Sequence, residues 1–477
     1  MLSRRVCSVA LALAFLTGVP KAAYAQSTSA INGGIQFDFS LPGARSLGMA
    51  GAFVAVADDV SAAQANPAGL TVLSRPEISL EIRGWNFYSL SPDRGHAFGD
   101  PTNIGTDVVS GIQNRTLRDT RASPGLFALA FPAGQWVLAA YRQQFSRFKN
   151  RIEEEGPYLT VPQGVDRTNP VTGLIDLDIV DYGFSVGRRI NPRWSIGGGV
   201  AVYDFSLQSR SEAFLVTPHD VVPTPAQRPL LTGAGQKFGP ADFRDANIVV
   251  FQEQDGEDFG VAVNAGITWQ PSAKVRVGAA FRQGPNFTFG SKFYLGSSLA
   301  VPGLAAGGLI DQDPEILFHV PDSYSAGVMY RPNDALMLGF EYDRVQYSKL
   351  LNGDGNGLPV ETAGQIGSGV PAVEAEGRKR VEGLEVDDSN QLRAGAEYYF
   401  SGSKLLLRLG SWFDPDHRQR FTDQSLPKEV INAPGGKNVV HVSGGLGRDF
   451  GRFRIDGAVD LSPYLNTFSV ATVVYLR

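Results

Sequence analysis

From Pro76 to the C-terminus the sequence repeats one pattern, in which segments of alternating apolar and polar residues are joined in pairs by tight turns. The turns are rich in Pro, Gly and Asn, as in residues 131–134 and 190–193. Alternation with a period of two indicates strands that have one apolar face. The pattern predicts fourteen strands, at 77–89, 123–132, 135–152, 172–190, 193–216, 258–270, 273–292, 318–332, 334–348, 385–400, 403–414, 437–450, 451–463 and 465–477.

The connections between these strands constrain the fold further. Short turns alternate with long connections, near 90–122, 153–171, 217–257, 293–317, 349–384 and 415–436. An even number of strands, with short turns at one end and long loops at the other, is typical of bacterial outer-membrane barrels. We therefore expect an all-β chain that folds as a 14-stranded antiparallel transmembrane β-barrel. A secreted soluble all-β protein is the alternative.

The alternation also assigns the faces of the strands. In residues 273–282, Val275, Val277 and Phe281 share one face, and Arg276 and Arg282 share the other. An arginine at the bilayer midplane costs about 2–4 kcal/mol, so the charged faces must point into the lumen. The same reasoning places two more arginines in the lumen: Arg393 and Arg408. These four either pair with lumenal carboxylates or bind the carboxylate of a ligand, and mutual pairing is the simpler interpretation.

The N-terminus has the features of an export signal. Arg4 and Arg5 precede the apolar run 6–16, and Ala23-Tyr24-Ala25 is a small-x-small cleavage site. We expect residues 1–25 to be a signal peptide and the mature chain to begin at Gln26. Cleavage would remove Cys7, the single cysteine, and with it any disulfide or Cys-ligated metal.

Charge and motifs exclude several functions. The net charge is −5, and no basic tract suggests a nucleic-acid partner. The five histidines lack metal-ligand spacing, and the calcium-like run 352–357 has Ala363 where an EF-hand loop requires Glu. We find no nucleophile elbow and no P-loop. The sequence therefore predicts neither a cofactor, nor a metal site, nor an enzyme.

A segment rich in small residues lies between the signal and the first strand. Residues 47–57 are almost all Gly, Ala and other small apolar types, and Asn66-Pro67-Ala68 follows. Small residues allow close backbone packing in a narrow bore, and Pro67 restricts Asn66 to an extended conformation. We expect residues 26–76 to form a hatch inside the bore of a barrel spanning 77–477. A plain loop after a short helix is the alternative for Asn66-Pro67-Ala68.

One long connection is unusually apolar. An exposed apolar patch usually marks a binding surface, so the connection is a candidate for substrate capture. The alternative is that the long loops pack on each other as a cap. The candidate residues are Phe293, Tyr294, Leu295, Leu299, Val301 and Leu304.

The hatch segment and parts of the barrel resemble the FadL-type outer-membrane transporters, which carry long-chain fatty acids and aromatic hydrocarbons. The resemblance rests on Gly43–Ala52, Ala57-Asp58-Asp59 and Asn66–Leu70, and on the barrel segments Asn264–Trp269, Val277–Arg282, Pro321–Tyr324 and Arg408–Pro415. It implies a fourteen-stranded barrel in the bacterial outer membrane, with a hatch whose movement at Asn66-Pro67-Ala68 opens a path. It also implies capture of substrate by apolar extracellular loops and sideways exit through the wall.

The resemblance implies three kinds of partner: outer-membrane lipid, a hydrophobic small molecule, and the barrel-assembly machinery. Two features depart from the family. The chain ends in Arg477 where an aromatic residue is expected, and strand 135–152 contains no Gly or Pro to kink it, so the sequence places no exit. We expect a channel for passive uptake of hydrophobic compounds. The alternative is a non-transporting barrel that serves as an assembly or adhesion scaffold.

Overall fold

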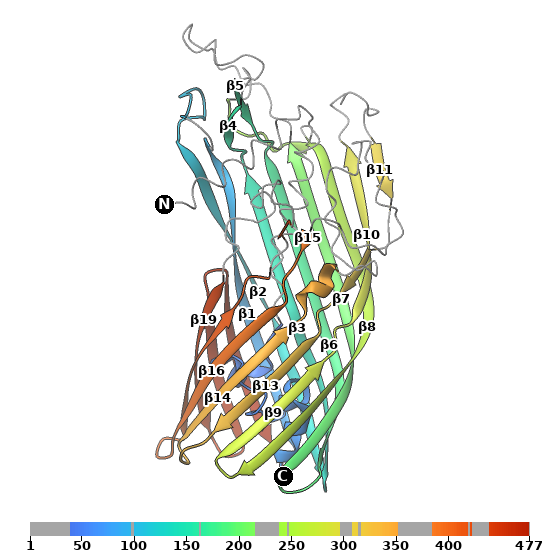
Figure 1. The fold of residues 1–477 in the computed structure, drawn as a ribbon, viewed down its shortest axis with the longest axis vertical. Coiled ribbons are helices and arrows are strands. Elements are labelled where there is room, and N and C mark those ends of the chain that lie inside the picture. Colours follow the sequence, from blue (N-terminus) through green and yellow to red (C-terminus); the bar gives the residue numbers. More distant parts are fainter. Residues whose placement is uncertain are drawn as a thin grey trace.

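The computed structural model describes residues 39–96, 100–161, 164–214, 238–245, 248–295, 308–312, 316–351, 384–417, 420–421 and 438–476. Strands dominate this part of the chain and stand side by side around a central axis (Figure 1). None of the helices in the described ranges is long and apolar enough to cross a membrane.

The strands form a closed 14-strand antiparallel barrel. Neighbours in sequence are neighbours in the wall, and β21 pairs with β1 from Glu77–Tyr475 to Phe87–Leu465, which closes the barrel. The wall strands are β1 (Glu77–His96), β2 (Gly111–Ala133), β3 (Trp136–Glu154), β6 (Val171–Arg189), β7 (Trp194–Phe214), β8 (Ile248–Ser272), β9 (Val275–Arg282), β13 (Ser323–Tyr330), β14 (Leu336–Val345), β16 (Ser389–Phe400), β17 (Leu405–Asp414), β19 (Val439–Asp449), β20 (Phe453–Leu461) and β21 (Leu465–Tyr475).

Each predicted strand segment overlaps one wall strand, and the fold prediction is confirmed. Residues 273–292 were predicted wrongly, because they do not form a single strand. β9 ends at Arg282, and β10 (Asn286–Leu295) begins after Gly284-Pro285. Proline donates no main-chain hydrogen bond and disfavours continuation of a ladder, which explains the break. The predicted connections 90–122 and 217–257 are also partly strand, because β2 begins at Gly111 and β8 begins at Ile248.

The wall is uneven in height. Strands β1, β2, β3, β6, β7 and β8 extend well beyond the others at the end that carries the long connections (Figure 1). We call this end the loop end and the opposite end, where short turns join the strands, the turn end. Small additional elements accompany the long strands or the loops at the loop end: β4 (Tyr158–Val161), β5 (Gly164–Arg167), β11 (Gly308–Gln312), β12 (Ile316–His319), η4 (Tyr347–Leu351), β15 (Leu384–Glu385) and β18 (Arg420–Phe421).

The outer face is apolar around the barrel. Alternate side chains such as Ile82, Phe259 and Leu409 are more than half exposed. At the turn end the rings of Trp194 and Trp269 stack with their centroids 5.7 Å apart. Aromatic side chains at the edge of an apolar band are typical of barrels that span a membrane.

The N-terminal described segment fills the bore. Residues 43–73 contain α3 (Gly43–Gly48), α4 (Ala62–Ala65) and η1 (Pro67–Val72), which lie within the turn-end half of the barrel (Figure 1). Nearly all of these residues are buried, including Met49, Phe53 and Val60. We call residues 39–73 the hatch.

Glycines of the wall provide the room for the hatch. An ideal Cβ on Gly278 would lie 2.5 Å from the carbonyl oxygen of Val54, and one on Gly339 would lie 2.6 Å from that of Ala52. Real Cβ atoms do not approach so closely, so only glycine fits these positions. Further inward-facing glycines make equally close approaches to the hatch: Gly197, Gly266, Gly395 and Gly410. We call these six residues the glycine belt.

Candidate functional site inside the barrel

Asn66 lies at the point where the hatch meets the wall. Its side chain is fully buried, and its backbone is extended, with φ −159°. The amide Nδ2 donates to the carbonyl oxygen of Val54 in the hatch (2.8 Å) and to that of Ile267 in β8 (3.4 Å). The amide Oδ1 accepts from the N–H of Ala68 (3.2 Å) and so caps η1. One side chain therefore connects two parts of the hatch to the wall.

Pro67 and Ala68 pack against Gly197 of β7. An ideal Cβ on Gly197 would lie 2.4 Å from the carbonyl carbon of Pro67 and 2.5 Å from the nitrogen of Ala68. Nearby, Thr71 Oγ1 donates to Ser195 Oγ in β7 (2.8 Å), and Ser185 Oγ in β6 donates to the carbonyl oxygen of Ala63 (2.7 Å). Arg189 Nη2 in β6 also donates to the carbonyl oxygen of Thr71. The hatch is thus held against β6, β7 and β8 by hydrogen bonds, with no ion pair on this side among the described residues.

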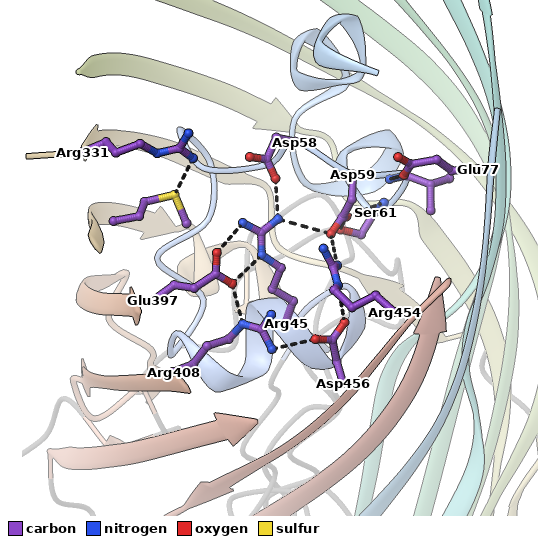
Figure 2. A network of polar contacts seen from close by, with 12 residues as sticks. Arg45, Asp58, Asp59, Ser61, Glu77, Arg331, Glu397, Arg408, Arg454 and Asp456 are labelled. Atoms are coloured by element: carbon purple, nitrogen blue, oxygen red, sulfur yellow. Dashed lines mark hydrogen bonds and ion pairs between the residues drawn. The ribbon is translucent and has the colours of Figure 1, made fainter. Parts of the chain in front are cut away.

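A charged network holds the other side of the hatch (Figure 2). Arg45 of α3 donates to both carboxylate oxygens of Glu397 in β16, at 2.9 Å each. Arg45 also pairs with two hatch carboxylates, Asp58 and, at 3.4 Å, Asp59. Bidentate arginine–carboxylate pairs are among the stronger side-chain hydrogen bonds.

The network continues into the wall. Arg408 Nε pairs with Glu397 Oε2 (2.6 Å), and Arg408 Nη1 pairs with Asp456 Oδ1 (2.7 Å). Arg454 Nη2 returns to the hatch at Asp59 Oδ2 (2.9 Å), and its Nε pairs with Asp456 Oδ2 (2.7 Å). Arginines and carboxylates therefore alternate around a closed ring, drawn in Figure 2. We call this set the charge ring: Arg45, Asp58, Asp59, Glu397, Arg408, Arg454 and Asp456.

Asp59 is a titratable hatch residue that pairs with two arginines of this ring, Arg45 and Arg454. Burial alone would raise the pKa of its carboxyl, but the charges of Arg454 and Arg45 outweigh burial and lower the pKa to about 2. Asp59 is therefore ionised at every physiological pH. Burial alone would lower the pKa of the Arg45 guanidinium, but the carboxylates of Asp58, Glu397 and Asp59 raise it well above its ordinary value.

Wall carboxylates also bind hatch backbone directly. Glu341 Oε2 in β14 accepts from the main-chain N–H groups of Phe53 (2.5 Å) and Val54 (2.6 Å). Arg393 in β16 donates to the carbonyl oxygen of Ala50 (3.1 Å) and pairs with Asp343 (2.5 Å). These contacts attach the turn 50–54 of the hatch to β14 and β16.

A cavity of about 130 Å³ lies within the bore. Hatch residues such as Leu41, Phe53 and Gln64 contribute to its lining, and so do wall residues at the loop-end rim of the short strands. Aromatic and charged groups alternate there: Trp85, Phe281, Arg282, Tyr347, Arg393 and Trp412. Three carboxylates line it as well, Glu341, Asp343 and Asp460, so the cavity presents apolar surface together with groups of both charges.

The four arginines predicted in the lumen divide into two pairs. Arg393 and Arg408 are engaged in internal ion pairs, as mutual pairing predicts. No ion pair to Arg276 or Arg282 forms among the described residues, and Arg276 Nη1 and Arg282 Nε have no hydrogen-bond partner there. The Arg282 guanidinium lies over the rings of Phe39 (4.5 Å) and Phe145 (4.9 Å) and lines the cavity, whereas Arg276 does not.

The predicted capture residues are only partly described. Phe293, Tyr294 and Leu295 form the end of β10, whose backbone pairs with β8 and β11. Leu299, Val301 and Leu304 lie outside the described residues. No group of three or more His, Cys, Asp or Glu side chains in the described ranges is placed to hold a metal ion.

Sequence reasoning missed the glycine belt and the hatch half of the charge ring. The signal for the belt was present, because glycine recurs at inward-facing positions of predicted strands, as at Gly278 and Gly395. Glycine weakens a strand interior and often marks a close approach of another backbone. The wall partner of Arg45, Glu397, lies 352 residues away in the sequence, and no local pattern indicates it.

A closed transmembrane barrel with an internal hatch and a cavity beside it defines a class of outer-membrane channels. A family model described as outer membrane protein transport protein (OMPP1/FadL/TodX) matches residues 166–429, more than half of the chain. The chain belongs to this family of outer-membrane transport proteins, as the resemblance in the sequence indicated.

Solved structures share the fold at low sequence identity. A FadL homologue of Pseudomonas aeruginosa is 13% identical with a TM-score of 0.59, covering 93% of this chain and 99% of its own. The toluene transporter TbuX of Ralstonia pickettii is 15% identical with a TM-score of 0.52 (91% and 98%). The P. putida toluene transporter TodX is 13% identical with a TM-score of 0.54 (92% and 100%). No curated protein sequence matches the chain.

Proposed function

We propose that the protein is a channel for passive uptake of hydrophobic compounds, such as long-chain fatty acids or aromatic hydrocarbons, across the outer membrane, and that movement of the hatch gates it. The observation that supports this most is the way the hatch is attached. It blocks the bore, yet Asn66 and a few other hydrogen bonds without ion pairs hold one side of it, while the charge ring holds the other. Rearrangement of the side held by hydrogen bonds costs less than separation of buried ions.

Arg282 is the group we propose for recognition of an acidic head group. It is a cation without a carboxylate at ion-pair distance in the described chain, and it lies between aromatic rings at the cavity. A fatty-acid carboxylate would form charge-assisted hydrogen bonds there. An aromatic hydrocarbon would use only the aromatic lining. Arg276 is buried without such a partner but does not line the cavity, so we assign it no ligand.

A lateral exit is supported between β2 and β3. Their main-chain pairing stops at Leu126–Gln143, and β3 has an irregularity between Gln144 and Ser146. Pro124 in β2 has no N–H to continue the ladder. Ile82, opposite Pro124 on β1, is 68% exposed, so the interruption begins at the depth of the apolar band. Beyond it, side chains bridge the strands, as in the Arg115–Glu153 ion pair.

The remaining expectations complete the proposal. Residues 1–25 would be removed on export, residues 26–76 would form the hatch unit and residues 77–477 the barrel unit, inserted into outer-membrane lipid by the barrel-assembly machinery.

Uptake by cells tests the proposal. Labelled oleate and labelled toluene are supplied to cells that express the protein and to cells that lack it. Faster uptake of either substrate by expressing cells is the expected result. If expressing cells and cells that lack the protein take up each substrate at the same rate, with the barrel present in the outer membrane, the result would contradict transport and favour the scaffold alternative.

A further inference from the structure

The wall has a second interruption, between β8 and β9. These strands pair up to Asn264–Arg282, and the pairing with β8 resumes only where β10 reaches Asp255–Gly290. One main-chain bond, from Gln283 N to Val263 O (3.0 Å), ends the lower ladder. Within the described chain, no strand pairs with residues 256–262 on this edge of β8.

The main chain nearest to this edge of β8 lies on the inner side of the wall and is not itself a strand of the wall. An ideal Cβ on Gly256 would lie 2.3 Å from Cβ of Phe289, and one on Gly260 would lie 2.6 Å from Cβ of Pro285. Both glycines occupy the inward-facing register of β8, which Ala262 and Gln254 share as buried neighbours. Residues 284–289 therefore lie against the inner face of β8, and we call them the shutter.

The shutter makes many hydrogen bonds on the edge that faces β12 and few toward β8. Its main chain pairs with β12 from Asn286–His319 to Phe289–Ile316, and Gly284 N donates to Asp322 Oδ1 (2.7 Å). Toward β8, apart from packing, a single carboxylate holds it: Asp258 Oδ2 accepts from Thr288 N (2.7 Å) and from Thr288 Oγ1 (3.1 Å). The side chain of Asp258 replaces the main-chain ladder that this edge lacks.

The unpaired edge lies at membrane depth. The outward side chains of Phe259 and Val261 are 69% and 64% exposed, and below them the rings of Phe281 and Tyr324 are in contact at 5.0 Å. Unpaired main chain is tolerated at this depth only where it is buried in protein or lines a hydrated cavity. The cavity lining includes Ala265, Phe281 and Arg282, which belong to the last paired residues of β8 and β9 before the interruption.

We propose that the β8–β9 interruption is a second lateral opening, which connects the cavity with the membrane and which the shutter closes. An amphiphile with an acidic head group reaches Arg282 through it, while its chain stays among Phe259, Val261 and Phe281. The role of this opening in uptake rests on the proposed transport function. The opening itself is a property of the wall and is measured without transport.

Lipid accessibility tests the opening. Cys7 lies before the expected cleavage point, so an introduced cysteine is the only thiol of the mature protein. A fluorophore is attached to Gln283→Cys, and the full protein is placed in nanodiscs of lipid brominated on the acyl chain. Tyr324→Cys, outward on β13, and Ser325→Cys, inward on β13, are the two references. Because the shutter closes the opening in the wild-type protein, quenching at Gln283 between the two references is expected, and quenching as weak as at Ser325 would overturn the opening.

The shutter and the head-group site have their own readouts. Asp258→Ala should increase the quenching at Gln283, whereas Asp258→Asn, which keeps an acceptor, should not; no change with Asp258→Ala would overturn the shutter. Chain-labelled spin-probe stearate should quench the Gln283 label more effectively than its methyl ester. Arg282→Gln should weaken stearate by about tenfold and leave the ester unchanged. Equal quenching by acid and ester would overturn the head-group site, whatever cellular uptake shows.

Discussion

Gly278 in β9 faces Val54 in the hatch so closely that an ideal Cβ on the glycine would lie 2.5 Å from the valine carbonyl oxygen. The contact is between backbone and backbone, and it recurs around the wall at Gly197, Gly339, Gly395 and Gly410, whereas Gly266 faces the side chain of Asn66. The hatch therefore fits because side chains are absent from the wall at these positions.

Gly278→Ala should displace the hatch without unfolding the barrel. The added methyl group collides with main chain, which cannot move aside as a flexible side chain would, while the strand ladder stays intact. We expect increased entry of a bulky antibiotic that the outer membrane normally excludes, and an unchanged heat-modifiable shift on gels. Gly444→Ala is the control, because the nearest atom to its ideal Cβ is 3.9 Å away. Equal permeability of the two variants would contradict the role of the belt.

Asn66→Ala should alter gating rather than folding. The substitution removes the bonds to Val54, Ile267 and Ala68, each with a net contribution of about 0.5–1.5 kcal/mol. We expect normal insertion with changed uptake of hydrophobic substrate. Wild-type uptake in a folded Asn66→Ala protein would remove this residue from the mechanism, and failure to fold would assign it a structural role.

Glu397→Gln should loosen the charged side of the hatch. Glu397 is shared by Arg45 and Arg408, and loss of one partner from a buried ion pair typically costs about 3–5 kcal/mol. Hydrogen exchange of α3 amides should accelerate. Asp242→Asn is the matched control, because its partner Arg244 is 78% exposed and neither residue belongs to the charge ring. Equal exchange in the two variants would show that the ring does not hold the hatch.

The contribution of Asp59 to hatch stability should be independent of pH across the physiological range. The pKa of Asp59 is lowered to about 2, so its stabilisation is complete above the unfolded value of about 4 and is lost as pH falls through about 2. The loss of hatch-amide protection caused by Asp59→Asn, measured by hydrogen exchange and corrected for intrinsic rates, should therefore be the same from about pH 5 to about pH 8. A loss that varies within that range would show that Asp59 titrates there.

Arg282→Gln should separate two substrate classes. Loss of the guanidinium removes charge-assisted bonds to a carboxylate but leaves the aromatic lining. Oleate uptake should fall by about tenfold while toluene uptake stays near wild type. Arg276→Gln serves as the control, because Arg276 does not line the cavity. A parallel fall for both substrates in Arg282→Gln would indicate damage to the bore instead of loss of recognition.

The sequence predicted the barrel because a strand period of two and segregated loop lengths are local signals. The inward placement of Arg393 and Arg408 followed from the same alternation. The break at Gly284-Pro285 was visible in the sequence, but the apolar alternation on both sides masked it. The partner of Arg45 could not be predicted, because barrel closure, not local sequence, brings Glu397 to α3.

The position of the proposed lateral exit between β2 and β3 could not be predicted from the sequence either. Strand 135–152 contains no Gly or Pro, yet β3 is irregular at Gln144–Ser146, where its pairing with β2 has ended. The proline that interrupts the ladder belongs to the neighbouring strand, at Pro124. A strand's own composition is therefore a poor guide to where its pairing fails.

The link between hatch and wall is short: η1 ends at Val72 and β1 begins at Glu77. Four intervening residues span at most about 14 Å when fully extended. Under the proposed gating, a plug on so short a tether stays close to the wall at its C-terminal end. Opening is then a rearrangement of the hatch within the bore, and its rate is set by a local conformational change and not by diffusion of a detached domain.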